Sequence, residues 1–274
     1  MLGALPTHLV LIGTMAIWLV PSLGLLISSF RPADRIANTG WWTVSPLELT
    51  LENYRAVLST NDLGQSFVNS LIVSIPATVM PMLIAAFAAF AFSWMRFPGR
   101  DALFFVIVGL LVVPIQMTLG PVLKLLTDVG LTGSFPAIWL AHTGYGLPFA
   151  IYLLRNFFSA LPREMFESAY LDGASPGTAF FQLALPTSVP ALASLAIFQF
   201  MWVWNDLLVA LIYLGGRPSV APMTVAISNL VSQYGEGWQL LTAAAFVSML
   251  LPLLVFFSLQ RYFVRGILAG SVKG

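Results

Sequence analysis

The sequence predicts an all-α protein that crosses a membrane six times. Hydrophobic residues make up 58% of its 274 residues and charged residues only 8%, whereas a soluble domain carries about 25% charged residues. Apolar runs recur at the length of about 20 residues that a helix needs to cross a hydrocarbon core of about 30 Å. We expect a single membrane domain over residues 1–274, with spans at residues 8–30, 67–94, 102–123, 135–154, 187–214 and 238–263.

Polar or turn-forming segments separate these spans. The connector 31–66 divides the first two, and its Trp41 and Trp42 are typical of side chains at a membrane surface. Pro114 interrupts the third span and predicts a kink, because proline removes a backbone hydrogen bond. The glycine-rich loop 215–237 divides the last two spans. Six spans place both chain ends on the same side as the polar segment that follows residue 155.

Basic residues favour the cytoplasm for that side, since loops facing the cytoplasm carry more Lys and Arg. Seven of the 12 lie there: Arg96, Arg100, Arg155, Arg163, Arg261, Arg265 and Lys273. Five lie on the other side: Arg31, Arg35, Arg55, Lys124 and Arg217. The difference of two predicts cytoplasmic termini. The family resemblance described below supports the same orientation and implies a multi-pass protein of the bacterial inner membrane.

Residues 163–184 predict a cytoplasmic hairpin of two short helices. Pro162 suits the start of the first helix, where its missing N–H is not used. Asp172-Gly173 predicts its end, because glycine adopts the left-handed conformation that closes a helix. Ser175-Pro176 predicts the next start, with serine as the cap, and Leu185-Pro186 marks the following boundary.

The first hairpin helix has two distinct faces. Its apolar face is predicted to be buried and contains Phe166, Ala169, Tyr170 and Gly173 at helical spacing. Another face contains Arg163 and Glu167, which form an i, i+4 pair. Glu164, Glu167 and Asp172, three of the chain's 11 acidic residues, fall within this short stretch.

The hairpin resembles the EAA loop of bacterial ABC importer permeases, which reads E-A-A-x₃-G-x₉-I-x-L-P. The matching residues are Glu167-Ser168-Ala169, Gly173 and Leu183-Ala184-Leu185-Pro186, with Ser168 and Leu183 as mild departures. The resemblance implies a type I ABC importer permease fold and a coupling helix that sits in a groove of the ATPase subunit. The residues it implicates in coupling are Glu164, Glu167, Ala169, Asp172, Gly173, Leu185 and Pro186.

The C-terminal tail, residues 266–274, is similar to that of the second permease subunit of maltose-type sugar importers. The resemblance implies that Gly270 and Lys273 contact the ATPase dimer, and that Pro114 moves during gating. It also implies a second permease, an ATPase dimer and an extracytoplasmic sugar-binding protein as partners. The segment 31–42 resembles permeases for α-glucosides, so a disaccharide is the expected substrate.

Asp206 is the one acidic residue inside a predicted span, within Trp202-Val-Trp204-Asn205-Asp206. A carboxylate in hydrocarbon costs roughly 2.5–3.5 kcal/mol, so it should face a cavity, a partner or the interface. Two interpretations stay open. In the first, Trp202, Trp204, Asn205 and Asp206 line the sugar path. In the second, which we favour, Asp206 caps or pairs with a neighbouring helix near the outer surface.

Several function classes are excluded by what the sequence lacks. It has no G-x-x-x-x-G-K-[ST] phosphate loop, so we expect a non-catalytic subunit that binds no cofactor, with ATP and Mg²⁺ on the partner ATPase. Cysteine is absent, and His8 and His142 lack partners at ligand spacing, so no metal site is expected. An ion-coupled secondary transporter and an ABC permease for a non-sugar solute remain as alternatives.

Overall fold

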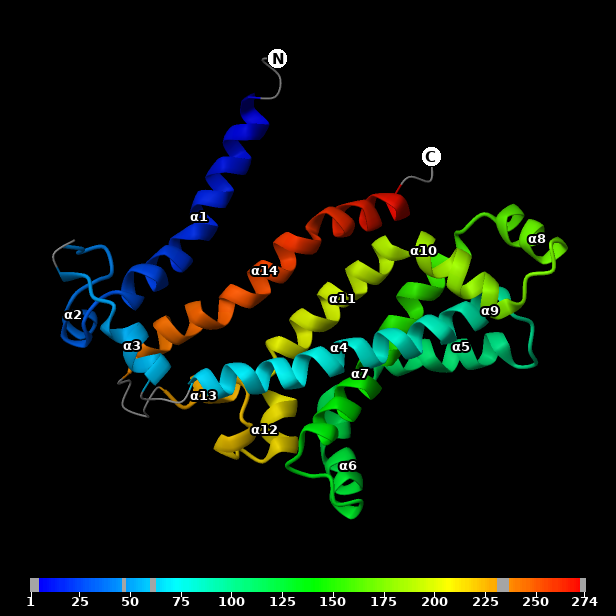
Figure 1. The fold of residues 1–274 in the computed structure, drawn as a ribbon. Coiled ribbons are helices and arrows are strands. Elements are labelled where there is room, and N and C mark those ends of the chain that lie inside the picture. The colour runs from blue at the N-terminus through cyan, green and yellow to red at the C-terminus, as the bar shows by residue number, and fades with distance from the viewer. Residues whose placement is uncertain (1–4, 46–47, 60–62, 231–236, 272–274) are drawn as a thin grey trace. The chain divides into compact units, whose positions relative to one another are not determined.

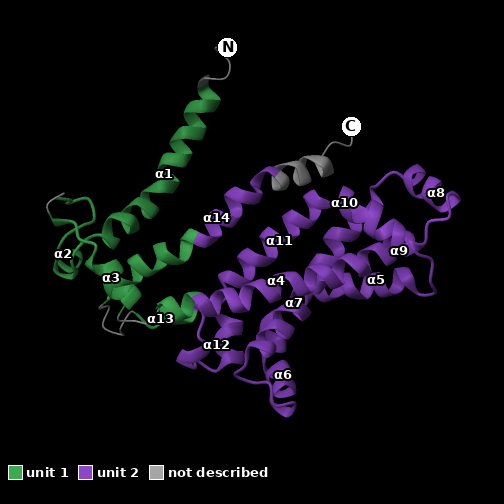
Figure 2. Cartoon of the chain, viewed as in Figure 1, with its two compact units in different colours: residues 1–67, 225–250 green, residues 68–224, 251–274 purple. Residues whose placement is uncertain are grey.

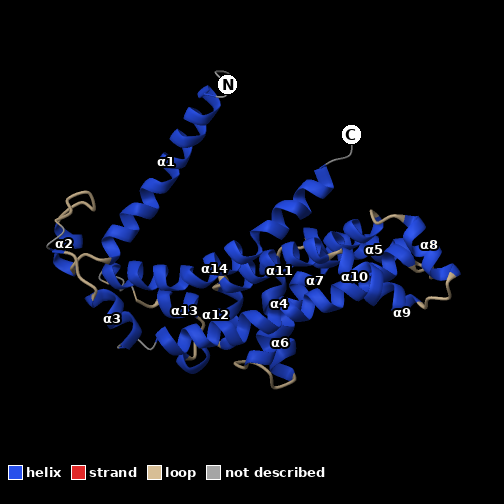
Figure 3. Cartoon of the chain, turned by 45° about the horizontal axis from the view of Figure 1, so that its top comes forward, coloured by secondary structure: helices blue, strands red, loops and turns tan. Residues whose placement is uncertain are grey.

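The computed structural model describes residues 5–45, 48–59, 63–230 and 237–271, and these residues form helices joined by loops (Figures 1 and 3). The chain divides into two compact units (Figure 2). The first comprises Met1–Phe67 and Val225–Leu250, and the second comprises Val68–Thr224 and Leu251–Gly274. The hairpin and the W-N-D segment both belong to the second unit, which therefore holds most of the predicted site residues.

The long apolar helices coincide with four of the predicted spans. They are α1 (Leu5–Ser29), α4 (Leu63–Trp94), α7 (Phe135–Ser159) and α14 (Trp238–Ser271). Each contains a segment that is long and apolar enough to cross a membrane. Two bent helix pairs bring the number of candidate spans among the described residues to six if each pair counts as one span.

The third predicted span is broken rather than kinked. It consists of α5 (Arg100–Gly109), the 3₁₀ turn Leu110–Val112 and α6 (Ile115–Asp128), with a bend of 103° between the two arms. Val113 is extended because a residue before proline avoids the helical region, and Pro114 lies directly before the first residue of α6. Figure 1 shows α6 turning away from α5. The sequence predicted a kink at Pro114, and the structure shows a complete break there.

The fifth predicted span is also divided. A bend of 73° separates the segment Pro176–Thr187 from α11 (Val189–Trp204), and Asn205-Asp206-Leu207 separates α11 from α12 (Leu208–Leu214). The first bend follows a π-helical turn at Phe180–Ala184 and α10 (Leu185–Thr187). Leu185-Pro186 thus lies at a helix boundary, as predicted.

The predicted polar connector of the first unit contains two short helices, α2 (Ala33–Asn38) and α3 (Glu52–Ser59). Buried Arg31 holds this segment together by donating to the carbonyl oxygens of Gly40 and Arg35, each at 3.1 Å. Asn53 donates to Ser29 O and Arg31 O at 2.9 and 2.8 Å. Side chains therefore satisfy the backbone acceptors of a segment that lacks long helices.

The remaining elements are α8 (Arg163–Leu171), α9 (Pro176–Ala179), the 3₁₀ turn Pro218–Val220 and α13 (Met223–Ser228). Of the predicted tail residues, Gly270 falls at the end of α14 and Lys273 lies outside the described residues. The contacts of the tail with an ATPase stay a prediction.

Candidate functional site

The hairpin α8–α9 has the helix ends that its sequence predicts. Gly173 has φ +83°, and the N–H of Ala174 donates to Ala169 O while that of Gly173 donates to Tyr170 O, at 2.9 and 3.1 Å. This is a Schellman cap, which satisfies carbonyls that the helix end would leave unpaired. Ser175 Oγ then accepts a hydrogen bond from the N–H of Thr178 at 3.1 Å and caps α9.

One aromatic side chain anchors α8 to the membrane helices. Phe166 is 1% exposed and stacks on Trp94 at the end of α4, with ring centroids 3.8 Å apart. Trp94 Nε1 in turn donates to Phe158 O near the end of α7 at 3.1 Å. Phe90 and Phe180 lie against the same cluster. The position of α8 is thereby tied to the ends of two long helices.

The prediction that Ala169, Tyr170 and Gly173 are buried on the same face as Phe166 is wrong. Tyr170 and Gly173 are exposed and Ala169 is only partly buried, so Phe166 is the one buried residue among those described in α8. Leu171 at the tip is 89% exposed. No ion pair joins Arg163 to Glu167 among the described residues, and both are exposed. The hairpin therefore presents more apolar surface outward than its helical periodicity suggested.

The predicted coupling residues fall into two groups. Glu164, Glu167, Asp172, Gly173 and Pro186 are exposed, whereas Ala169 and Leu185 are partly buried, and Leu185 packs against the aromatic cluster under the hairpin. Figure 1 shows α8 and α9 next to the ends of α4, α5 and α7. The hairpin therefore has an exposed surface, while its base packs against the ends of the membrane helices.

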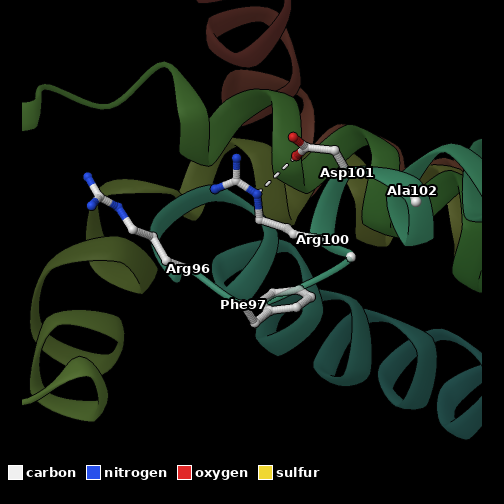
Figure 4. Close-up of a pocket in the computed structure, with 6 residues that line it drawn as sticks. Arg96, Phe97, Arg100, Asp101 and Ala102 are labelled. Atoms are coloured by element: carbon white, nitrogen blue, oxygen red, sulfur yellow. Dashed lines mark hydrogen bonds and ion pairs between the residues drawn. The ribbon is translucent and has the colours of Figure 1, made fainter.

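The turn between α4 and α5 lies directly after Trp94 and contains a shallow hollow of about 430 Å³ (Figure 4). Arg100 Nε contacts Asp101 Oδ1 at 3.0 Å, so these two charges pair with each other. Arg96 extends away from this pair and is exposed. The turn adds positive charge at the base of the hairpin.

Asp206 is part of a helix cap. Its Oδ1 accepts from the N–H of Val209 at 3.2 Å and its Oδ2 from that of Ala210 at 2.9 Å, both in the first turn of α12. His142, which the sequence suggested had no partner, lies with Nε2 3.6 Å from Asp206 Oδ2 and is fully buried. These contacts fit the structural interpretation of Asp206, and they link α7 to the break between α11 and α12.

A half-open cavity of about 260 Å³ lies between α7 and α11. We call it the aromatic cavity. It is lined by Tyr145, Gly146, Phe149, Phe198, Gln199 and Trp202. Of the four predicted sugar-path residues, only Trp202 lines it. Trp204 is buried against Phe200, and Asn205 is exposed and donates to Met201 O at 2.7 Å. The other cavity residues were missed because they come from separate helices.

Comparison with known proteins identifies the family. The model of binding-protein-dependent transport system inner membrane components matches residues 3–269. The chain belongs to this family. It is 58% identical over 274 residues to the osmoprotective compounds uptake permease protein GgtD of Synechocystis, covering 98% of this chain and 92% of that one. It is 56% identical to the alpha-glucoside transport system permease protein AglG of Rhizobium meliloti, over 84% of this chain and 62% of that protein.

A solved transporter structure contains a chain with the same fold as this protein. A chain of a bacterial ABC transporter that imports the acidic polysaccharide alginate superposes with a TM-score of 0.80 at 21% identity, covering 94% of this chain and 95% of that one. The all-α, polytopic permease fold expected from the sequence is thereby confirmed. The chain is a multi-pass permease of the inner membrane.

Proposed function

We propose that the chain is one of two permease subunits of an ATP-driven, binding-protein-dependent importer of oligo- or disaccharides, with α-glucosides as its substrate class. The family match over residues 3–269 supports the importer assignment. The substrate class is supported by the relative that is named as an alpha-glucoside transport permease, at 56% identity.

The observation that carries the mechanism is the hairpin, which is exposed at its tip and anchored at its base. Leu171, 89% exposed, and the neighbouring acidic side chains would meet the groove of the ATPase subunit. A large apolar side chain at such a tip gains free energy by losing its contact with water in a complex. Glu164, Glu167 and Asp172 add charge that can select the partner surface.

Movement of α8 would pass to the membrane helices through Phe166. Its stack on Trp94, and the hydrogen bond from Trp94 to Phe158 O, connect α8 to the ends of α4 and α7. Closure of the ATPase dimer would displace α8 and tilt these helices, which opens the path to the other side. The break at Pro114 supplies a joint at which such motion can be taken up.

The ATPase dimer supplies the energy in this mechanism. ATP and Mg²⁺ are held by the partner ATPase, and this subunit is non-catalytic. Both chain ends face the cytoplasm, where Gly270 and Lys273 of the tail contact the ATPase dimer. The sugar-binding protein delivers the substrate on the opposite side.

Purification of the complex tests this proposal. The tagged chain is extracted from its native membrane in a mild detergent, and the proteins that purify with it are identified by mass spectrometry. Recovery of an ATPase and a second permease with its own EAA loop is expected, together with a sugar-binding protein. Recovery of a homodimer without an ATPase would contradict the importer and favour an ion-coupled transporter. Recovery with a binding protein for a polyamine or phosphate would contradict the sugar substrate.

A further inference from the structure

We propose that the aromatic cavity binds one ring of the transported sugar, so that this subunit contacts the substrate directly. The inference rests on the proposed function, because it assumes that a sugar passes through the complex. It assigns a site to the residues between α7 and α11, of which the sequence pointed only to Trp202.

The lining has the chemistry that a pyranose ring requires. Small-molecule sites combine aromatic walls with a few polar groups that fix orientation. Here Tyr145, Phe149, Phe198 and Trp202 supply apolar ring faces that can stack on the C–H faces of a sugar. Gln199 supplies the polar group, at 4% exposure.

The orientation of the Gln199 amide follows from its partners. Its Nε2 donates to Ala77 O at 3.1 Å and to His142 O at 3.5 Å. Both donors of the amide are thereby used by backbone carbonyls, and a primary amide has one further group, its carbonyl oxygen. Oε1 receives no hydrogen bond within the described part of the chain. It is therefore available to accept a hydrogen bond from a sugar hydroxyl.

The cavity walls are held in place by contacts behind them. The hydroxyl of Tyr145 lies 2.6 Å from that of Tyr213 and accepts from Thr118 Oγ1 at 3.2 Å. The ring of Trp202 meets His142 edge-to-face, with centroids 5.0 Å apart, and His142 contacts Asp206. A site whose rings are already fixed loses little conformational entropy when a ligand binds. Asp206 thus acts as a positioning residue for Trp202.

The size and composition of the cavity favour a sugar ring over a helix of the second permease. Pockets for drug-sized ligands have volumes of about 300–1,000 Å³, so 260 Å³ suits one ring of a disaccharide. Helix pairs in membranes instead meet through small residues that allow close approach. In this cavity the one small residue, Gly146, already lies against the Gln199 side chain.

A pair of glycine variants tests the role of Gln199. A Cβ at Gly146 would lie 2.6 Å from Gln199 Oε1, so Gly146→Ala forces the amide to move. A Cβ at Gly144, two residues earlier in the same helix, would meet no atom within 4 Å, which makes Gly144→Ala the matched control. Gly146→Ala should raise the KM of α-glucoside uptake about tenfold, the effect of losing one hydrogen bond. Equal KM values in the two variants would overturn the proposal.

Photolabelling of the assembled complex gives the direct measurement. The complete importer in lipid nanodiscs is irradiated with an α-glucoside that carries a diazirine, with and without excess methyl α-glucoside. Label is expected on the peptides that contain residues 145–149 and 198–202, and it should decrease with the competitor. Phe198→Leu, at an exposed wall residue, should reduce it while the complex still purifies intact.

The outcomes separate this inference from the proposed function. If the ATPase and second permease purify with the chain but the label falls only on the second permease, the cavity does not bind sugar and the importer assignment stands. If no ATPase purifies with the chain, the proposed function itself fails.

Discussion

Replacing Phe166 by alanine should disconnect the coupling helix from the membrane helices. Phe166 is the buried residue of α8, at 1% exposure, and its ring stacks on Trp94. Truncation of a buried phenylalanine costs about 3–5 kcal/mol. A helix of nine residues is too short to keep its structure without tertiary packing. The fixed position of α8 therefore depends on this contact.

This loss of free energy can be expressed as a change in the ratio of docked to undocked α8. At about 1.4 kcal/mol for each factor of ten, 3–5 kcal/mol lowers the ratio of docked to undocked α8 by at least about a hundredfold. Phe166→Leu keeps most of the apolar volume and loses the stacking energy of about 0.5–1.5 kcal/mol, so its effect should be intermediate. Phe181→Ala, at an exposed ring of the neighbouring π-helical turn, is the control.

The assay measures sugar uptake and ATP hydrolysis in the same proteoliposomes, which contain the complete importer. Phe166→Ala should lower the number of sugars imported per ATP hydrolysed, and Phe181→Ala should not. The quantity of ATPase subunit in each preparation is measured, so that loss of assembly is distinguished from loss of coupling. Wild-type sugar uptake per ATP in Phe166→Ala would show that α8 does not transmit motion through this side chain.

Three other predictions follow from the same geometry. Gly173→Val should reduce sugar uptake, because a branched side chain at φ +83° costs roughly 1–2 kcal/mol. Gly173→Asn should retain sugar uptake, since asparagine tolerates that conformation. Equal uptake by both variants would contradict the role of the Schellman cap. Leu171→Asp should reduce the amount of ATPase that purifies with the permease. It should not lower the thermal stability of the permease, because the side chain is 89% exposed. Full recovery of the ATPase would show that Leu171 is not part of the contact with the ATPase. Asp206→Ala should lower thermal stability through the loss of the α12 cap, typically worth about 1 kcal/mol. Unchanged thermal stability would contradict the capping role.

Local chemistry explains why the hairpin could be predicted from the sequence. Pro162, Gly173 and Ser175 act on backbone groups within a few residues, so their positions alone identify the helix ends. Burial is different, because it depends on what packs against each face. Tyr170 and Gly173 share a face with Phe166, yet only Phe166 reaches the cluster formed by α4 and α7.

The aromatic cavity and the His142–Asp206 contact could not be predicted for the same reason. Their residues are separated by many positions in sequence and meet only after α7 and α11 pack together. Spacing rules apply within one helix, so they made His142 look isolated. The position of the third-span break was predictable from Pro114, but its angle of 103° was not, since proline specifies a lost hydrogen bond and not a direction.

Uptake by the reconstituted importer tests whether this chain belongs to an ATP-driven sugar importer. Proteoliposomes contain the chain with its purified partners, the binding protein is added outside, and accumulation of a radiolabelled α-glucoside is measured with and without ATP inside. An ATP-driven importer should accumulate the sugar only when ATP and the binding protein are both present, and dissipation of ion gradients should not change the accumulation. Accumulation without ATP that follows a proton or sodium gradient would contradict it.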